Sequence, residues 1–256
     1  QVDTEFDYHT HNFHKITIFI SGNVQYFIEG KTYTLNPYDI VLVNRNDIHR
    51  IQVDSSIPYE RIIVYISPGF MEAYRTTEYN LAYCFEQARE KQSYVLRIPS
   101  LETSSLYKTT QRLERSFHDH EYAGSLYRQI LFLEFMIQLN RATLKEGIEY
   151  LDTKLYNKKV LDIMNYIQDH LTETISMDSL ASVFYLSKYH MMRLFKAETG
   201  VTIGHYITYR RLLLARRYIH SGMPITDACF ACGFQSYSAF SRAYKQEFKE
   251  PPRKLK

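Results

Sequence analysis

Two stretches near the end of the chain repeat each other. Residues 187–196 recur as residues 235–245, and both copies contain the pattern x-Arg-x-aromatic-Lys. The arginines of this pattern, Arg193 and Arg242, stand 49 positions apart. Each copy follows a short apolar segment and a turn, which is the arrangement of a helix-turn-helix unit. The repeat therefore predicts two such units in series and, with them, binding to double-stranded DNA.

The first copy predicts a helix with one polar face. Ser176 is a suitable N-cap for a helix over residues 177–184, and Ser187 for a second helix that ends at Gly200. In the second helix, positions i, i+1, i+4, i+5 and i+8 share a face. These positions carry Lys188, Tyr189, Met192, Arg193 and Lys196. A helix that presents Arg, Lys and an aromatic side chain on one face suits the major groove.

The second copy repeats this design. Residues 225–232 predict a supporting helix, Gly233-Phe234 a turn, and Ser236 the N-cap of the next helix. The predicted inward positions of that helix are Phe240, Tyr244 and Phe248. Its predicted DNA-facing positions are Tyr237, Ser238, Ser241, Arg242 and Lys245.

One long helix is predicted between the two units. Residues 203–221 rise about 1.5 Å each and so span roughly 28 Å, close to the ~34 Å between successive major-groove faces. Such a helix could hold both reading helices on one side of the duplex. It carries Arg210, Arg211, Arg216 and Arg217. We expect at least half of these arginines to be ordinary surface residues and the others to contact phosphates.

The net charge of +3 conceals an asymmetry between the two parts of the chain. Residues 158–256 hold 15 Lys and Arg against 8 Asp and Glu, a balance of +7. The remaining residues hold 16 against 20, a balance of −4. A basic block beside an acidic body is typical of a polyanion-binding module attached to a domain with another role.

The first part of the chain is rich in short strands. Between residues 6 and 68, segments such as residues 16–20 alternate with period two, and Gly22 and Gly30 mark tight turns. Many short, closely spaced strands predict a small antiparallel barrel or sandwich. Helices are then predicted over residues 70–88, 102–118 and 125–143.

The helix over residues 125–143 is apolar on nearly all sides, so more than one side must be covered. Two covers are possible, namely the barrel with the preceding helix, or a second subunit.

Cysteine usage and hydropathy narrow the location of the protein. Its cysteines, Cys84, Cys229 and Cys232, are too few for a disulfide framework, which favours the reducing cytoplasm. Cys229 and Cys232 fall within a predicted supporting helix and are better explained as small packing residues than as metal ligands. No run of about 18 apolar residues predicts a membrane span, and residue 1 onwards shows no signal-peptide pattern.

The C-terminal part resembles the DNA-binding domain of the AraC/XylS family of bacterial transcription regulators. Matching residues extend in order over residues 175–255. They are Leu180-Ala181, Leu186-Ser187, Arg193, Phe195-Lys196, Gly200, Tyr206, Arg211, Ala215-Arg216, Ile225, Gly233-Phe234, Phe240, Arg242, Tyr244-Lys245 and Pro252. The resemblance implies base contacts from Tyr189, Met192 and Arg193, and from Tyr237, Ser238 and Arg242. The chain departs from the family pattern at Cys229, usually Ala, and at Lys249, usually Gly.

The strand-rich part resembles the cupin-like sensor of the same family. His9, His11, Lys15 and Gly22 stand at the spacing of the first cupin motif, H-x-H-x3-E-x6-G, with Lys15 at the glutamate position. Tyr38, Asn44, Asn46 and His49 stand at the spacing of the second motif, where only His49 keeps the residue type. A lysine in place of an anionic ligand repels a cation. We therefore expect no metal and no cofactor, and we assign His9, His11, Lys15 and His49 to a site for a polar or anionic effector.

These features predict a multidomain α+β chain. Residues 1–100 are expected to form a cupin-like effector-binding barrel, residues 101–146 a helical dimerisation segment, residues 147–157 a linker and residues 158–256 an AraC-type DNA-binding domain. The resemblance implies a cytoplasmic, homodimeric transcription regulator that responds to a small molecule such as a sugar and works with RNA polymerase. It also favours activation of transcription over repression. It is not expected to be an enzyme or to contact a membrane.

Two alternatives remain open at this point. The barrel could be a metal-dependent cupin enzyme with a DNA-binding appendage, which stoichiometric Fe, Mn or Zn in the purified protein would support. It could also only dimerise or meet another protein, in an effector-independent regulator. Removing residues 1–150 would then leave regulation insensitive to any metabolite, whereas loss of a metabolite response would indicate a sensor.

Overall fold

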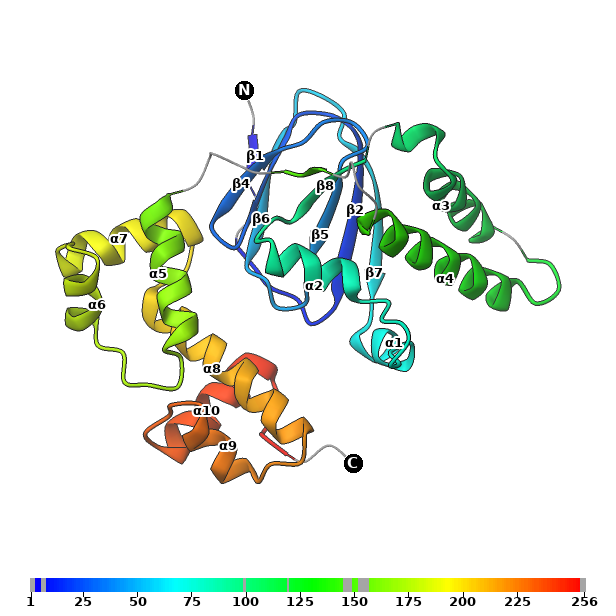
Figure 1. Cartoon of the computed structure of the whole chain (residues 1–256). Coiled ribbons are helices and arrows are strands. Elements are labelled where there is room, and N and C mark those ends of the chain that lie inside the picture. The colour runs from blue at the N-terminus through cyan, green and yellow to red at the C-terminus, as the bar shows by residue number, and fades with distance from the viewer. Residues whose placement is uncertain are drawn as a thin grey trace. The chain divides into compact units, whose positions relative to one another are not determined.

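The computed structural model describes residues 3–5, 8–98, 100–118, 120–144, 149–151 and 157–253. The chain divides into two compact units, residues 1–155 and 156–256. The first unit is rich in strands and carries a few helices, whereas the described part of the second unit is helical (Figure 1). This confirms the predicted α+β fold class.

Two antiparallel sheets with a common core make up the first unit (Figure 1). One sheet has the strand order β1-β6-β3-β4 and the other has the order β7-β2-β5-β8-β9. The strands are β1 (Asp3–Glu5), β2 (His14–Ser21), β3 (Val24–Ile28), β4 (Lys31–Thr34), β5 (Ile40–Val43), β6 (His49–Asp54), β7 (Glu60–Ile66), β8 (Val95–Arg97) and β9 (Glu149–Tyr150). The turn between β2 and β3 requires Gly22, with φ of 120°, because a Cβ there would lie 3.1 Å from the Pro58 carbonyl oxygen.

Strand β2 is buried on both faces. Thr17 and Phe19 lie on the face towards the barrel interior. Ile16 and Ile18 lie on the opposite face together with His14. The His14 ring is 4.6 Å from the ring of Phe85, which belongs to a covering helix. The alternation in residues 16–20 therefore separates two buried faces from each other rather than a buried face from solvent.

The helices of the first unit are α1 (Pro68–Ala73), α2 (Tyr83–Glu90), a short 3-10 turn (Leu101–Thr103), α3 (Ser105–Ser116) and α4 (Gly124–Thr143). The single helix predicted over residues 70–88 is wrong, because α1 and α2 are separate. The Thr76 hydroxyl accepts the backbone N–H groups of Glu78 and Tyr79 at 3.2 and 3.1 Å. These local hydrogen bonds compete with helical ones and form a turn.

Asn140 of α4 fixes this helix against α2. Helix α2 begins at Ala82 without a side-chain cap of its own. The Asn140 side-chain oxygen accepts the Cys84 N–H at 2.7 Å, and its amide donates to the Leu81 carbonyl at 2.9 Å. A buried amide from a distant segment thus supplies the missing N-terminal cap.

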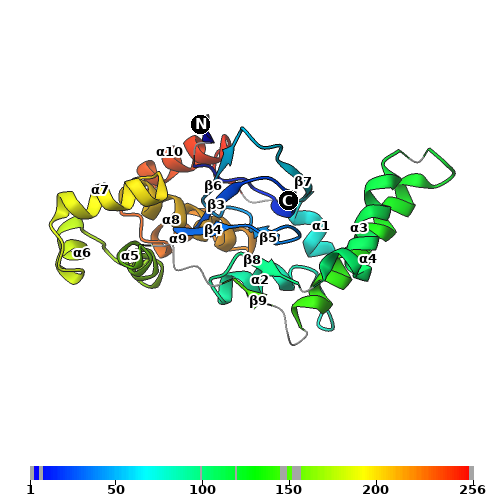
Figure 2. The same cartoon turned by 90° about the horizontal axis from the view of Figure 1, so that it is seen from above.

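Helix α4 lies beside α3 (Figure 2). One apolar side of α4 is buried. Leu131, Phe135 and Leu139 are fully buried. Other apolar side chains of α4 remain open to solvent, with exposed fractions of 56% for Leu126, 53% for Ile130 and 42% for Ile137. Helix α4 was predicted to be covered on more than one side, and within a single chain this cover is incomplete.

Part of the predicted linker, residues 147–157, belongs to a sheet. Residues 147, 148 and 152–156 lie outside the described residues. Between them, β9 pairs with β8, with Tyr150 opposite Leu96. Leu151 continues this contact, because its N–H donates to the Val95 carbonyl at 2.9 Å. The chain therefore leaves the first unit from the edge of the five-stranded sheet.

The second unit follows the predicted order of helices. They are α5 (Lys158–Asp169), α6 (Met177–Val183), α7 (Lys188–Thr199), α8 (Ile203–His220), α9 (Ile225–Ala231) and α10 (Tyr237–Phe248). Ser176, Ser187 and Ser236 cap α6, α7 and α10 as predicted, and Gly200 ends α7 with φ of 75°. Among the described residues, no helix is both long enough and apolar enough to cross a membrane.

Candidate nucleic-acid interface and effector site

Helix α7 presents the first predicted DNA-reading set on its outer side. Met191 and Phe195 are buried, and the Phe195 ring packs 5.5 Å from that of Tyr206 in α8. This packing turns the opposite side outward. The exposed side chains on it are Lys188, Tyr189, Met192, Arg193 and Lys196. Lys188 also forms an exposed ion pair at 3.0 Å with Asp178 of α6, which leaves Arg193 and Lys196 as the cations directed to solvent.

Helix α10 repeats this arrangement. Phe240 and Tyr244 are buried, and Phe248 is partly buried against them. The predicted reading set of this helix is exposed apart from half-buried Ser241, and consists of Tyr237, Ser238, Ser241, Arg242 and Lys245. Each reading helix therefore joins a buried aromatic face to an outer face with Arg and Lys, the geometry that places base-contacting side chains in a major groove.

Most of the arginines on the connecting helix α8 are structural. Arg210 is 9% exposed and lies 5.0 Å from the Tyr206 ring. Arg211 donates from Nε to the Leu171 carbonyl at 2.9 Å. Arg216 lies 4.8 Å over the Phe248 ring, whereas Arg217 is exposed. The expectation that at least half are ordinary surface residues underestimated their packing role.

The four residues predicted to line the effector site form a compact cluster at the barrel. The ring of His49 lies 4.3 Å from that of His9 and 4.8 Å from that of His11. His49 is fully buried, and its burial, together with the nearby Lys15 and other imidazoles, lowers its pKa to about 3. Burial, with a smaller contribution from Lys15, also lowers the pKa of His11. Both imidazoles are therefore neutral at physiological pH.

Their hydrogen bonds set which ring nitrogen carries the proton. Nδ1 of His11 lies 2.7 Å from the Phe13 carbonyl oxygen, and Nδ1 of His49 lies 3.0 Å from the Asp47 carbonyl oxygen. A carbonyl only accepts, so each Nδ1 must be the donor. Each Nε2 then bears a lone pair, and both Nε2 atoms are buried without a hydrogen-bond partner in the described part of the chain.

Lys15 lies on the interior face of β2, opposite Val43 of β5 and Tyr65 of β7. Its side chain is buried, with the ammonium 5.7 Å from the Tyr26 ring. Burial lowers its pKa to about 8, and the positive charge of Arg61 acts in the same direction. Lys15 is thus still mostly protonated at neutral pH.

Sequence reasoning missed further polar residues on the same interior faces. The hydroxyl of Tyr26 lies 3.2 Å from that of Tyr59, and Arg61 lies 4.2 Å over the Tyr59 ring. Arg61 pairs with Phe19 and so lies on the same side of the sheet as Lys15, although its own side chain is exposed. The alternation of side chains along a strand could have identified such residues in the sequence, because residues two apart in a strand share a face.

Among the described residues, no group of three or more His, Cys, Asp or Glu side chains is arranged to hold a metal ion. Cys229 and Cys232 are both fully buried in the core of the second helix-turn-helix unit. They therefore pack as small apolar residues.

Two family models together match most of the chain. The model described as an AraC-like ligand binding domain matches residues 2–136, and one described as a helix-turn-helix domain matches residues 180–256. The chain belongs to the AraC family. It is a transcription regulator of AraC type, with a ligand-binding domain followed by a DNA-binding domain.

Known AraC-type proteins resemble the chain over nearly its whole length. The activator RhaS of Enterobacter sp. (strain 638) is 26% identical over 255 residues, covering 98% of this chain and 87% of that protein. RhaS of Escherichia coli (strain SMS-3-5 / SECEC) is 24% identical, with coverages of 98% and 88%. Among solved structures, ToxT from Vibrio cholerae matches with 14% identity and a TM-score of 0.39, covering 98% of this chain and 95% of that one.

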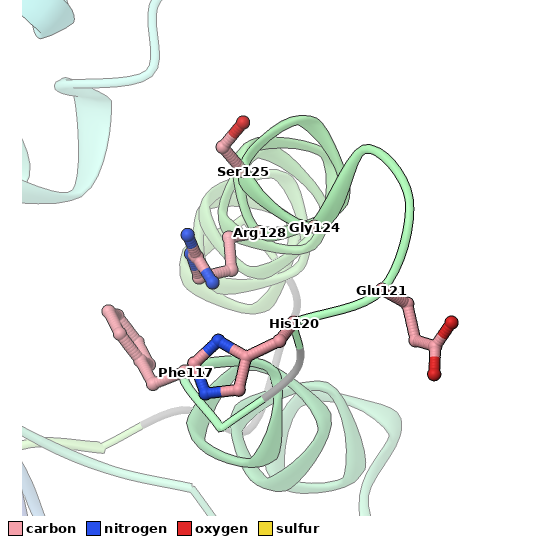
Figure 3. A pocket seen from close by; sticks show the side chains of 6 residues that line it. All are labelled: Phe117, His120, Glu121, Gly124, Ser125 and Arg128. Carbon is pink, nitrogen blue, oxygen red and sulfur yellow. The ribbon is translucent and has the colours of Figure 1, made fainter.

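An open hollow of about 430 Å³ lies where α3 ends and α4 begins (Figure 3). It is lined by Phe117, His120, Glu121, Gly124, Ser125 and Arg128. Arg128 donates to the Ser116 carbonyl at 3.0 Å and lies 5.7 Å from the Phe117 ring. Its cation thus helps to close the helical hairpin, and we assign the hollow no ligand.

The turn of the first AraC-type helix-turn-helix unit contains a strained tyrosine that sequence reasoning also missed. Tyr185 is 95% exposed and has a φ of 52°. Counted from the first residues of α6 and α9, it corresponds to Gly233, whose φ is 86°. Gly233 is required, because a Cβ there would lie 2.9 Å from the Thr172 carbonyl oxygen. The spacing of the repeat could have revealed that the two turns differ. The supporting helices α6 and α9 start 48 residues apart, whereas the reading helices α7 and α10 start 49 residues apart.

We predict that Tyr185→Gly stabilises the second unit. The substitution removes left-handed strain of about 1–2 kcal/mol, partly offset by the greater backbone freedom of glycine in the unfolded chain. The free energy of unfolding in urea should rise by roughly 0.5–1 kcal/mol. Gly233→Ala serves as the opposite control and should lower it. A loss of stability in the Tyr185 variant would contradict the assignment of strain.

Proposed function

We propose that this protein is a transcription activator that reads DNA through α7 and α10 and responds to a small molecule bound in its N-terminal barrel. The observation that supports this most is the repeated outer face with Arg193 and Arg242 in equivalent positions. Activation is proposed because the relatives of nearly full length are named as activators. We further propose RNA polymerase as a partner, the cytoplasm as the location, and no enzymatic activity.

The side chains suggest distinct roles at the groove. We assign Arg193 and Arg242 to guanine edges, since bidentate Arg–guanine pairs are the commonest specific contacts. The Met192 side chain, 39% exposed, suits a thymine methyl group. Lys196 and Lys245 suit phosphates, which position the protein without reading sequence. Tyr189, Tyr237 and Ser238 complete the proposed base-contacting set.

We propose that two chains pair through the apolar side of α4 formed by Leu126, Ile130 and Ile137. These residues repeat at helical spacing and remain exposed in the single chain. A homodimer would cover them and would also bring two pairs of reading helices to one promoter.

Ile130→Glu is predicted to weaken this dimer by at least about tenfold. Burial of an isoleucine side chain stabilises a contact by ~1.5–3 kcal/mol. The substitution replaces this apolar side chain by a charged one, and it does so in both chains of the dimer. Sedimentation equilibrium measures the shift towards monomer. Tyr122→Glu is the control, because Tyr122 is 99% exposed and lies in the turn before α4 rather than on the helix. An unchanged dimer in the Ile130 variant would place the subunit contact elsewhere.

The proposed function is tested by capturing random genomic fragments on the purified full chain at ~0.15 M salt, close to physiological ionic strength, and sequencing them. Enrichment of a sharp motif that Arg193→Ala plus Arg242→Ala abolishes supports the function. The same bulk, salt-sensitive binding by both proteins, with no motif, would contradict it. Genes next to the enriched fragments then indicate which metabolites to test.

A further inference from the structure

The charge of Lys15 is unbalanced within its site. The side chain is 9% exposed, yet among the described residues the influences on its ammonium are its own burial and another cation, Arg61. No carboxylate in the described part of the chain pairs with it. Buried charges are normally paired, because leaving water without a partner is costly. Folding alone therefore does not account for a lysine at this position.

The neighbouring imidazoles have the opposite requirement. Nε2 of His11 and Nε2 of fully buried His49 are acceptors that no donor in the described segments reaches. Protonating them is opposed by burial and by Lys15 itself. A ligand that satisfies them must bring hydroxyl or N–H donors, whereas a ligand that satisfies Lys15 must bring a negative charge.

The rest of the interior suits a ligand with several oxygens. The paired hydroxyls of Tyr26 and Tyr59 can both donate and accept, and the Arg61 guanidinium lies against the Tyr59 ring. The Tyr26 ring lies 5.7 Å from the Lys15 ammonium, and Arg61, although exposed, lies near enough to act on the Lys15 charge. The two cations, Lys15 and Arg61, stand with no acidic residue between them on β2 or β7.

We propose that the effector is a hydroxylated carboxylate of the sugar-acid class, with its carboxylate on Lys15 and its hydroxyls donating to Nε2 of His11 and His49. This inference rests on the proposed function, since it names the ligand class of the barrel. A neutral sugar would leave Lys15 without a counter-ion, and a simple fatty acid would leave both Nε2 atoms without donors. A metal ion would be repelled by Lys15.

The test compares matched acidic and neutral sugars on the full chain. Galacturonate, glucuronate and gluconate are titrated calorimetrically, and galactose and glucose are titrated in parallel. All titrations use the same ionic strength and pH 7, the pH for which the net charge of +3 applies. At least one acid should bind at least about tenfold more tightly than its neutral counterpart, as expected when a ligand pairs a desolvated cation. Equal or tighter binding of the neutral sugars would overturn the inference, as would the absence of binding by any acid at millimolar concentration.

Variants of Lys15 provide a second reading. Lys15→Met should abolish the preference for the acid and, without ligand, should raise the melting temperature of the first unit, because an unpaired buried charge is removed. Lys15→Arg should retain part of the preference, and it keeps the test valid if the methionine variant does not fold. The matched control is Lys108→Met, an exposed lysine of α3, which should change neither property. Acid binding by Lys15→Met equal to that of the parent would overturn the inference.

Two further measurements separate this inference from the proposed function. Galactose 1-phosphate is included, and tighter binding of this phosphate than of any acid would overturn the carboxylate assignment. Operator binding by the parent chain is measured in parallel. A sequence-specific chain that binds none of the acids would keep the proposed function and lose this inference.

Discussion

Replacing Arg193 and Arg242 together by alanine is expected to weaken binding to the cognate DNA site by about 10²–10⁴-fold, from ~1–3 kcal/mol for each base-contacting arginine. Both side chains are exposed on the outer faces of α7 and α10, opposite buried aromatic rings. Their removal should therefore leave the helices folded while deleting two base contacts. Fluorescence anisotropy with the enriched fragment measures the change, and circular dichroism verifies the fold.

Arg217→Ala is the matched control for this double substitution. Arg217 is exposed on α8 and carries the same charge, but it lies outside both reading helices. It should weaken binding only slightly and equally on cognate and unrelated DNA, since a phosphate contact carries no sequence information. A similar loss for the control and the double variant would show that charge alone explains the effect, and would contradict base reading by Arg193 and Arg242.

Acidification is expected to destabilise the first unit, with the loss beginning near pH 6.5, the ordinary histidine pKa. Burial, aided by Arg45 and Arg89, lowers the pKa of His14 to about 4, and burial lowers that of His49 to about 3. Because these pKa values are depressed in the folded state, the unfolded chain binds more protons below pH 6.5. The stability they contribute is present above pH 6.5 and is lost as the pH falls towards 4 and below. The expected loss is on the order of several kcal/mol.

Hydrogen–deuterium exchange resolves this loss by unit. Amides of β2 and β5 should lose protection between pH 7 and pH 4 once the intrinsic pH dependence of exchange is corrected, while amides of α7 change less. His49→Gln should flatten the dependence in the first unit, because it removes the group with the lowest of these pKa values. His190→Gln, at an exposed position of α7, should leave it unchanged. Uniform loss of protection in both units would contradict a role for the buried imidazoles.

The C-terminal unit was highly predictable because its signals are local. Ser176, Ser187 and Ser236 announce helix starts, and Gly200 announces an end. The spacing of Phe240 and Tyr244 then determines which face is buried. A misjudged detail was Arg210, although its contact with Tyr206 is also local, because the two residues stand four positions apart on one helix.

The first unit was less predictable because its decisive contacts join distant segments. Asn140 caps α2 across more than fifty residues, and the break between α1 and α2 depends on the Thr76 hydroxyl. Motif spacing singled out His9, His11, Lys15 and His49, which lie close together in the structure, while their role as an effector site stays a prediction. It could not show which nitrogens stay unpartnered, since that depends on the carbonyl oxygens of Phe13 and Asp47.

The pairing of β9 with β8 sets the length of the tether between the two units. With Leu151 held at the sheet edge, the six steps to Asn157, just before α5, can span at most about 21 Å. Were this two-residue strand to detach, the free chain would begin near Leu144 at the end of α4, and thirteen steps could span about 45 Å. A tether about twice as long lowers the effective concentration of each unit around the other. A few backbone hydrogen bonds therefore set the reach of the chain that joins the two units.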